Sequence, residues 1–377
     1  YLRFLKELLL PTRPTGPATY RRWLLLILFI PAFFLVQSAH WLFLLLDELL
    51  FPGYRRVQVR NPLFVVGLPR SGTSFLQRVL ARDEARFTTT RLWELVLAPS
   101  ISQRQMILGA GWLDRLMGRP VGRMLAWVQR RGFRWMEAIH EVALTDPEED
   151  YFLFLPVFAC FLLVVPFPYQ ESIWELATFD KLPAGKRHRL MSFYKRAIQR
   201  HLYVAGPEKQ LLSKNPSFTP FLASLRETFP DARFLCCVRD PVEVVPSLLS
   251  SIQSGAGLLG YEVAEPRIRD RFVDMLSFFA SYAQATLSTL PDDRYAFVPL
   301  PELKEGLEPF LLAVYRRFGW EPDEAFSAAL SDEASRGQAH KSRHRYSLGE
   351  FGLREESIRR RFESFNESFG FSSGSPA

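Results

Sequence analysis

The sequence predicts an α/β fold, a three-layer sandwich in which helices cover both faces of a central parallel sheet. From Leu63 onward, short apolar runs of strand length alternate with longer stretches whose apolar residues recur at the helical period. This alternation is typical of βαβ units, whose strands are parallel. The composition agrees, because 377 residues with 48% hydrophobic and 23% charged side chains exclude a disordered chain, a collagen-like repeat and a protein with many membrane spans.

Four strands are expected where apolar runs meet turn residues, at 63–67, 211–213, 233–238 and 295–299. A long helical insertion at about 92–205 separates the first two, and a closing helix is expected near 355–369. These limits divide the chain into an N-terminal apolar segment over 1–55, one domain over 56–371 and a flexible tail over 372–377.

The N-terminal segment carries no formal charge between Trp23 and Leu46, and as a helix this run would reach roughly 36 Å, enough to span a bilayer. Pro31 is expected to interrupt it, and basic residues flank both ends, so there is no orientation signal. We therefore expect a membrane-associated helical segment, bent at the proline, whose two apolar arms enter one leaflet from the cytoplasmic face. A true span that places the domain in a lumen, and packing of the arms on the domain, are the alternatives.

Cysteine and histidine usage gives no sign of a structural metal. The three cysteines include no CxxC pair, and the six histidines are scattered, so we expect no metal site. Cys236 and Cys237 are neighbours in an expected strand, and their side chains should point to opposite faces of the sheet. Three cysteines cannot form a disulfide framework, which favours a reducing compartment.

A glycine turn joins the first strand to a helix. Gly67 and Gly72 are separated by four residues, and the apolar positions after Ser74 fall on one helical face. Such a turn directs backbone N–H groups and the positive end of a helix dipole at one point, so a phosphate is the expected occupant. The spacing matches a nucleoside-triphosphate loop, but Thr73 stands where an ATPase needs lysine, and the basic residue is the earlier Arg70.

A second anion-binding element follows the third expected strand. That strand delivers Arg239 at its carboxyl end, where open α/β sheets bind ligands. Asp240 and Pro241 have the residue types of an N-cap and first helical position, and Ser247 lies further along the same helix. The alternative is structural, with Arg239 paired to Asp240 and Ser247 solvated.

Together these residues resemble the sulfotransferase superfamily that uses 3′-phosphoadenosine-5′-phosphosulfate (PAPS), most closely the broad type called sulfotransferase family 3. The resemblance covers about residues 55–370 and rests on an ordered series of motifs: Pro-Arg-Ser-Gly-Thr-Ser at 69–74, Leu-Trp-Glu at 92–94, His140, Pro-Glu-Glu-Asp at 147–150, Lys-Asn-Pro at 214–216, Arg-Asp-Pro at 239–241 and His-x-Tyr-Ser-Leu at 344–348. It implies a P-loop-type fold and a donor that leaves as adenosine 3′,5′-bisphosphate.

The resemblance also implies roles for individual residues. The 5′-phosphosulfate would be held by Arg70, Ser71, Gly72, Thr73 and Ser74, and the 3′-phosphate by Arg239 and Ser247. A late basic run would close over the nucleotide, with Lys341, Arg343 or Tyr346 near the 3′-phosphate. As a charge run, it would otherwise be a solvated face.

Sulfuryl transfer gathers negative charge on the leaving phosphate and takes a proton from the acceptor. Arg70 and Lys214, at the end of the second expected strand, are the candidate cations, although Lys214 could also be a solvated end-of-strand lysine. The candidate bases are His140, which titrates near neutrality, and Glu94, which follows Trp93; related tyrosylprotein sulfotransferases use a glutamate at a comparable distance after the loop. Alternatively, His140 is a core histidine.

The acceptor is expected to be hydrophobic. No charge lies between Tyr151 and Gln170, a stretch rich in phenylalanine that we expect to be helical, mostly core, and to supply one wall of the acceptor pocket. With the apolar N-terminus, it favours a lipid-like acceptor with a hydroxyl or amine, presented at a membrane. We then expect the basic residues behind the formal charge of +7 to bind a nucleotide and a lipid surface, and we expect no nucleic-acid partner. A carbohydrate acceptor, a P-loop kinase or NTPase, and a silent membrane scaffold remain alternatives, and the oligomeric state stays open.

Overall fold

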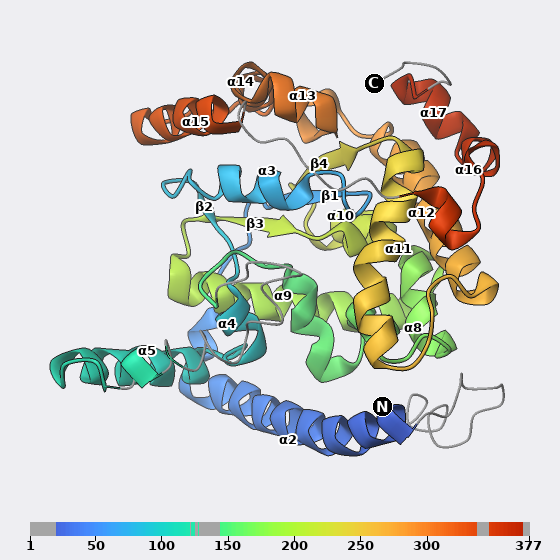
Figure 1. The fold of residues 1–377 in the computed structure, drawn as a ribbon. Helices are drawn as coiled ribbons and strands as arrows, with labels where there is room; N and C mark the ends of the chain where they lie inside the picture. The colour runs from blue at the N-terminus through green and yellow to red at the C-terminus, as the bar shows by residue number, and fades with distance from the viewer. Residues whose placement is uncertain (1–19, 121, 125–126, 128–143, 338–346, 372–377) are drawn as a thin grey trace.

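The protein is a three-layer α/β sandwich with a long helix along one side (Figure 1). A computed structural model describes residues 20–120, 122–124, 127, 144–337 and 347–371. The predicted fold class is confirmed. The expected tail at 372–377 lies outside the described residues.

The central sheet has five parallel strands in the order β2-β3-β1-β4-β5. All four predicted strands are present, and the second is one residue longer at each end than expected. The short β2 was not predicted, because two residues are too few to show a period. The strands are β1 (Leu63–Gly67), β2 (Phe87–Thr88), β3 (Gln210–Lys214), β4 (Arg233–Val238) and β5 (Tyr295–Pro299).

Each face of the sheet packs against its own hydrophobic core. Cys236 belongs to one core and Cys237 to the other, so the prediction that they point to opposite faces is confirmed. The Cys237 core is covered by α3 (Thr73–Leu80), α13 (Leu300–Glu305), α14 (Leu307–Arg317) and α15 (Glu324–Gly337). The larger Cys236 core includes residues of α10 (Leu222–Thr228), α11 (Pro241–Leu258), α12 (Pro266–Leu287), α16 (Glu355–Arg361) and α17 (Glu363–Phe369).

The described part of the insertion between β2 and β3 is mostly helical, as predicted, but its apolar stretch is not one long helix. Pro156 lies in that stretch, and Phe158 has a φ of 55°, so the chain forms two short 3₁₀ helices instead. The described elements are α4 (Leu92–Val96), α5 (Ile101–Leu116), η2 (Asp150–Val157), η3 (Phe161–Val164), α8 (Glu171–Trp174), η4 (Glu175–Lys181) and α9 (Ala184–Ala205).

The chain closes with two helices where one was predicted. Phe362 separates α16 from α17, because its backbone leaves the helical region (φ −115°, ψ 23°) while its ring is buried in the larger core. The remaining short elements are η1 (Pro52–Arg56), η5 (Pro216–Phe221), η6 (Asp292–Arg294) and η7 (Leu348–Phe351).

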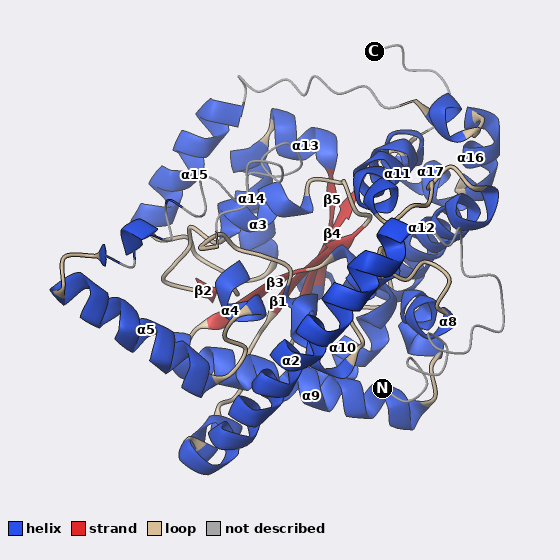
Figure 2. Cartoon of the chain, turned by 60° about the horizontal axis from the view of Figure 1, so that its bottom comes forward, coloured by secondary structure: helices blue, strands red, loops and turns tan. Residues whose placement is uncertain are grey.

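The N-terminal helix α2 (Tyr20–Leu50) continues through Pro31, so the expectation that this proline interrupts the helix is wrong. Beyond the proline, Phe33 and Phe34 pack against the ring of Phe158 in the insertion, which anchors the helix. Figure 2 shows α2 crossing the near face of the molecule, with α5 diverging from it. The segment Ile27–Leu50 is long and apolar enough to cross a membrane by length and composition alone.

Candidate active site

The loop between β1 and α3 is shaped by two glycines. A Cβ on Gly67 would lie 2.2 Å from the carbonyl oxygen of Cys237 in β4, and Gly67 has a φ of +114°. Gly72 is the N-cap of α3 with a φ of +86°, a region that L-residues rarely adopt. The turn therefore presses against β4 and then opens toward the first N–H groups of α3, which lack partners within the helix.

Ser71 supplies the strongest sign of a ligand in this loop. Its hydroxyl is buried and has no hydrogen-bond partner among the described residues. Buried polar atoms are nearly always satisfied, so an orphan beside a helix N-terminus indicates that a bound group completes it. Thr73 is the buried first residue of α3, and Ser74 is exposed one position further on.

Arg70 joins the loop to the second predicted anion site. Its backbone is left-handed (φ 66°), and its Nε donates a hydrogen bond to Ser247 Oγ at 3.1 Å. Arg239 Nη1 donates to the Arg70 carbonyl at 2.9 Å, while its other nitrogens contact Glu243. The structure thus joins Arg70 of the first predicted anion-binding element to Arg239 and Ser247 of the second. Ser247 is buried rather than solvated.

Asp240 caps α11 as predicted, with its Oδ1 accepting from the Val242 N–H at 2.8 Å. Its ion pair is with Arg359 of α16, at 3.0 Å, and Arg239 pairs with Glu243. The carboxyl end of β4 is therefore tied to the C-terminal helices.

Lys214 lies at the carboxyl end of β3, in register with Val65 of β1 just before the glycine loop. The side chain is only 4% exposed, and its Nζ forms an ion pair with Glu149 Oε1 at 2.8 Å. It is therefore a buried, paired cation and not a solvated lysine. The next residue, Asn215, has a buried side-chain nitrogen without a partner in the described structure, a second orphan close to the loop.

The turn after Lys214 is bonded directly to the glycine loop. Thr219 Oγ1 donates to the Gly67 carbonyl and accepts from the Gly67 N–H, both at 3.0 Å. Two motifs that are 152 residues apart in sequence are thereby fixed to each other at the carboxyl edge of the sheet. This edge, where the strand order reverses around β1, is where open α/β sheets bind ligands.

Asp150, the last residue of the Pro-Glu-Glu-Asp motif, is a buried carboxyl group to which the sequence assigned no role of its own. Tyr194 donates to its Oδ2 at 2.5 Å and Ser213 to its Oδ1 at 2.9 Å. Burial raises the pKa of Asp150 from 3.8 to about 6 against the lowering effect of these two hydrogen bonds. The available signal was the acidic run at 147–150 directly before an apolar stretch.

Glu94 of α4 belongs to a polar cluster with Arg104 of α5 and His201 of α9. One oxygen accepts from the Arg91 N–H at 2.8 Å and completes the helix cap, and the other lies 3.4 Å from Arg104 Nη1. Arg104 is almost fully buried and also contacts His201 Nδ1 at 2.9 Å. Burial and the Arg104 charge lower the pKa of His201 well below its usual value.

Four predicted site residues lie outside the described part of the chain: His140, Lys341, Arg343 and Tyr346. Within the described part, no three His, Cys, Asp or Glu side chains gather as a possible metal site.

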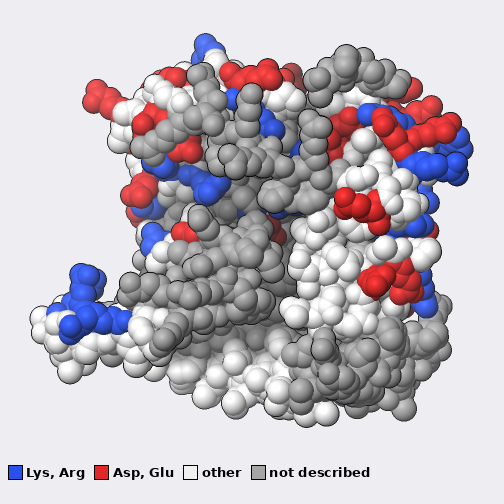
Figure 3. Space-filling model, viewed as in Figure 1, with Lys and Arg blue, Asp and Glu red and all other residues white. Residues whose placement is uncertain are grey.

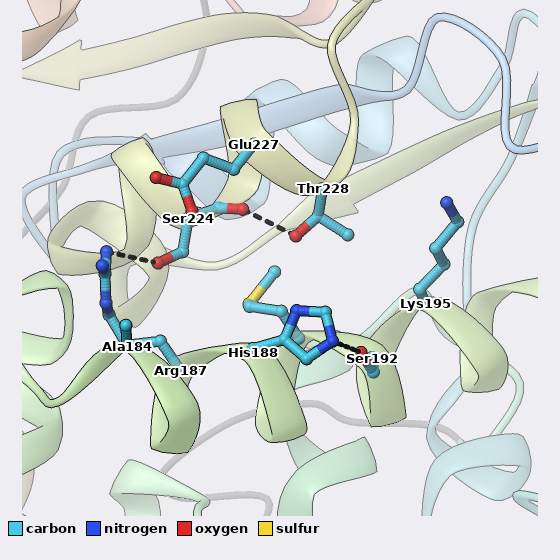
Figure 4. A pocket seen from close by; sticks show the side chains of 9 residues that line it. Ala184, Arg187, His188, Ser192, Lys195, Ser224, Glu227 and Thr228 are labelled. Carbon is cyan, nitrogen blue, oxygen red and sulfur yellow. Dashed lines mark hydrogen bonds between the residues drawn. The ribbon is translucent and has the colours of Figure 1, made fainter.

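A pocket of about 400 Å³ lies between α9 and α10 (Figure 4). His188, Ser192 and Lys195 line it from α9, opposite Ser224 and Thr228 of α10. None of the described residues expected to bind the donor lines this pocket, so it is separate from the site built around the glycine loop.

Comparisons with known proteins agree with this geometry. A model of the Sulfotransferase family matches residues 62–324, more than half of the chain. The sulfotransferase STF9 from Mycobacterium avium has a similar structure, with a TM-score of 0.68 and 20% identity over 85% of this chain and 79% of its own. STF1 from Mycobacterium tuberculosis H37Rv has a TM-score of 0.65 and 20% identity over 83% of this chain and 79% of its own.

Comparison with curated protein sequences gave no significant match. The family model spans the glycine loop, Lys214, Arg239 and Ser247, which the fold brings to one edge of the sheet. The chain therefore belongs to the sulfotransferase family, and the enzyme is a PAPS-dependent sulfotransferase.

Proposed function

We propose that the enzyme transfers a sulfuryl group from PAPS to a hydroxyl or amine of a hydrophobic, lipid-like acceptor at a membrane. The observation that carries the donor half is the orphaned, buried Ser71 hydroxyl at the start of α3. The acceptor half rests on the apolar helix α2, which is bonded to the same domain as the donor site.

The residues at this edge of the sheet fit a donor with two phosphate groups. Ser71, the open turn at Gly72 and the free N–H groups of α3 suit the 5′ end, with Thr73 and Ser74 beside them. Arg239 and Ser247 suit the 3′-phosphate. When bound, PAPS supplies the sulfuryl group and departs as adenosine 3′,5′-bisphosphate.

Arg70 and Lys214 supply positive charge for the leaving phosphate. Ser247 holds the Arg70 guanidinium, and Glu149 holds the Lys214 ammonium, so both cations are positioned before any ligand arrives. Preorganised charge of this kind is typically the largest single contribution to catalysis of group transfer. Glu149 thus has a positioning role that acts through Lys214.

The general base is His140 or Glu94. Both oxygens of Glu94 are already engaged, one by the Arg91 N–H and one by Arg104, which supports His140 for this role. Substitution separates the two candidates: a base variant loses turnover and retains affinity for adenosine 3′,5′-bisphosphate. Near-full turnover in both His140→Ala and Glu94→Gln would remove both from the mechanism.

A lipid-like acceptor fits the position of the apolar residues. The 3₁₀ segment η2 packs against α2, where Trp41 Nε1 donates to the Pro156 carbonyl at 3.0 Å. The helix that would meet a membrane is thus bonded to the segment proposed as one wall of the acceptor pocket. Exposed arginines beside α2 favour an anionic leaflet, which is the cytoplasmic one in most cells, and we therefore place the enzyme there rather than in a lumen.

A thermal-shift panel with adenosine 3′,5′-bisphosphate, ATP and GTP tests the donor, since a ligand that binds only the folded protein raises the melting temperature. We expect stabilisation by the bisphosphate. Greater stabilisation by ATP would favour the kinase alternative, and no stabilisation by any of the three would favour a silent scaffold.

Transfer of labelled sulfuryl from PAPS to a panel of long-chain alcohols, long-chain amines and soluble sugars tests the acceptor. We expect the long-chain compounds to be preferred. Roughly tenfold better turnover on a soluble sugar would overturn the lipid proposal and establish the carbohydrate alternative.

A further inference from the structure

We propose that α2 and α5 together form a two-helix platform that lies in the plane of one leaflet of an anionic membrane, without spanning it. The inference rests on the membrane-bound acceptor proposed above and names the surface that would bring the enzyme to it. The platform is defined by the exposed apolar side chains of α2 from Ile27 to Leu50 and of α5 from Met106 onward.

The inner side of α2 is bonded to the domain by polar groups. Gln37, His40 and Asp47 are buried on that side. Asp47 accepts from the N–H groups of Ile101 and Ser102 at 2.8 and 2.9 Å. The start of α5 is therefore capped by α2.

Two more contacts extend this attachment. Arg200 of α9 pairs with Asp47 at 3.1 Å, in a fully buried position, and with Glu48 at 2.7 Å. His40 Nε2 lies 3.2 Å from the Val96 carbonyl. A helix that crossed the bilayer would have to leave these partners and carry Asp47 unpaired, and removing one partner of a buried ion pair costs about 3–5 kcal/mol.

The outer side of α2 is apolar and open. Leu28, Leu35, Leu42, Leu45 and Leu49 are between 57% and 78% exposed. Four of these leucines recur at seven-residue intervals, which places them along one stripe opposite the bonded side.

Helix α5 projects from the body and is exposed for most of its length (Figures 1 and 2). Only its first turn, Ile101 to Arg104, is buried. Beyond it, Met106, Trp112, Leu113 and Leu116 are between 52% and 66% exposed.

The two helices expose far more apolar surface than a soluble monomer normally does. The largest contiguous apolar patch of a typical monomer is about 300–600 Å², and larger exposed patches mark interaction or membrane surfaces. In the described part of the chain, Leu162, Tyr203 and Leu258 are the only exposed large hydrophobic side chains outside residues 27–127.

The distribution of these residues favours lipid over a second copy of the chain. Met106, Ile107 and Leu108 are consecutive and all exposed, so apolar groups point in directions about 100° apart around α5. A packed protein partner usually covers one stripe of a helix, whereas the interface of a leaflet accepts a wider apolar sector.

Positive charge completes the match to an anionic leaflet. Arg115, Arg119 and Arg123 are exposed at the free end of α5, where Figure 3 shows a cluster of basic side chains. Arg56 is exposed just beyond the end of α2. The edge of the molecule along α2 shows neither blue nor red in the same view. An apolar face bordered by arginines is typical of helices that lie in the interface.

Vesicle co-sedimentation of the full chain tests the platform. We expect binding to phosphatidylcholine vesicles that is strengthened by phosphatidylglycerol. The variants Leu42→Glu and Leu113→Glu each place a carboxylate on an exposed platform position and should weaken binding by roughly tenfold or more. The control is Ala328→Glu, which adds the same charge at an exposed site on α15 and should bind as the wild type does.

Labelling distinguishes an in-plane helix from a span. Single cysteines are introduced as Arg21→Cys, in the first turn of α2, and as Gln58→Cys, beyond the end of α2; the three native cysteines are buried. An impermeant maleimide added outside reconstituted vesicles should label both positions. Protection of one position alone would establish a span and overturn the inference.

Two further outcomes would also overturn it. One is equal vesicle binding by Leu113→Glu and Ala328→Glu. The other is a wild-type chain that does not bind vesicles and forms a stable dimer in sedimentation velocity, which Leu113→Glu dissociates. This result would make the surface an interface between copies of the chain. Failure of the platform is separable from failure of the proposed reaction, since Arg70→Ala should lose turnover and retain vesicle binding, and Leu113→Glu should still bind adenosine 3′,5′-bisphosphate.

Discussion

Arg70 of the glycine loop and Ser247 of α11 form a hydrogen bond of 3.1 Å although 177 residues separate them in the chain. The bond links the two halves of the donor site, because Ser247 belongs to the element proposed to hold the 3′-phosphate and Arg70 to the one proposed for the 5′ end. Because the bond joins both halves, the affinity for adenosine 3′,5′-bisphosphate should change when either half is altered.

Ser247→Ala should weaken the binding of adenosine 3′,5′-bisphosphate by roughly tenfold, because it removes a hydroxyl that both positions Arg70 and is placed to contact the ligand. Isothermal titration calorimetry measures the change. The matched control is Ser251→Ala on the same helix, whose exposed hydroxyl donates only to the Leu248 carbonyl and whose loss should leave affinity unchanged. Equal affinities in the two variants would contradict the assignment of Ser247.

Gly67→Ala should lower the free energy of unfolding by roughly 3 kcal/mol or more, because the new Cβ would collide with β4 in a backbone region that alanine avoids. Gly109→Ala is the control: it lies inside α5 with nothing within 4 Å of the new Cβ, and alanine should add about 0.5–1 kcal/mol there. Urea unfolding measures both. Equal stability of the two variants would show that β1 and β4 are less tightly packed than described.

Asp150 should make stability depend on pH in a defined direction. The pKa of Asp150 is raised in the folded state, so the folded protein binds this proton more tightly than the unfolded chain does. The contribution of Asp150 to the free energy of unfolding is therefore fully present below about pH 4 and is lost as the pH rises through about 6. Asp150→Asn should therefore gain stability relative to the wild type across this window, by about 3 kcal/mol at most.

The difference between wild type and Asp150→Asn isolates this carboxyl group from the others, and urea unfolding at about pH 4 and about pH 7.5 measures it. A difference that stays constant with pH would mean that Asp150 titrates normally. The partners of Asp150, Tyr194 and Ser213, remain in both proteins.

Lys214→Ala should reduce kcat by about 10²–10³, because it removes a buried cation placed beside the glycine loop. Glu149→Gln should keep the cation but lose its ion-pair partner, and we expect a smaller loss of kcat that depends on ionic strength. Lys209→Ala is the control and should retain full turnover, because Lys209 is partly exposed and its Nζ donates to the Glu84 carbonyl. Equal kcat values for Lys214→Ala and Lys209→Ala would remove Lys214 from the chemistry.

Turnover should survive EDTA, since Arg70, Lys214 and Arg239 are placed to meet the charge of the donor without a divalent ion. Steady-state assays with and without the chelator test this. Loss of activity on chelation, with recovery on added magnesium, would favour phosphoryl transfer.

The strands and the donor loop could be predicted because their signals are local. An apolar run bounded by turn residues is enough to place β1 and β4, and the loop follows from Gly67 and Gly72 alone. Prediction failed where the local signal was absent or overridden. Strand β2 was missed because it has only two residues. The interruption expected at Pro31 does not occur, and Phe33 and Phe34, just beyond it, pack against the domain.

The sequence by itself determined the fold class, the four main strands, the glycine loop and the family. Only the tertiary structure decided which polar groups meet: Lys214 with Glu149, Arg70 with Ser247, and Asp47 of α2 with Arg200. It also decided that α2 turns a bonded side to the domain and that α5 projects from it. The physical reason is that periodicity and turn chemistry act over a few residues, whereas ion pairs, burial and exposed faces depend on how distant elements pack.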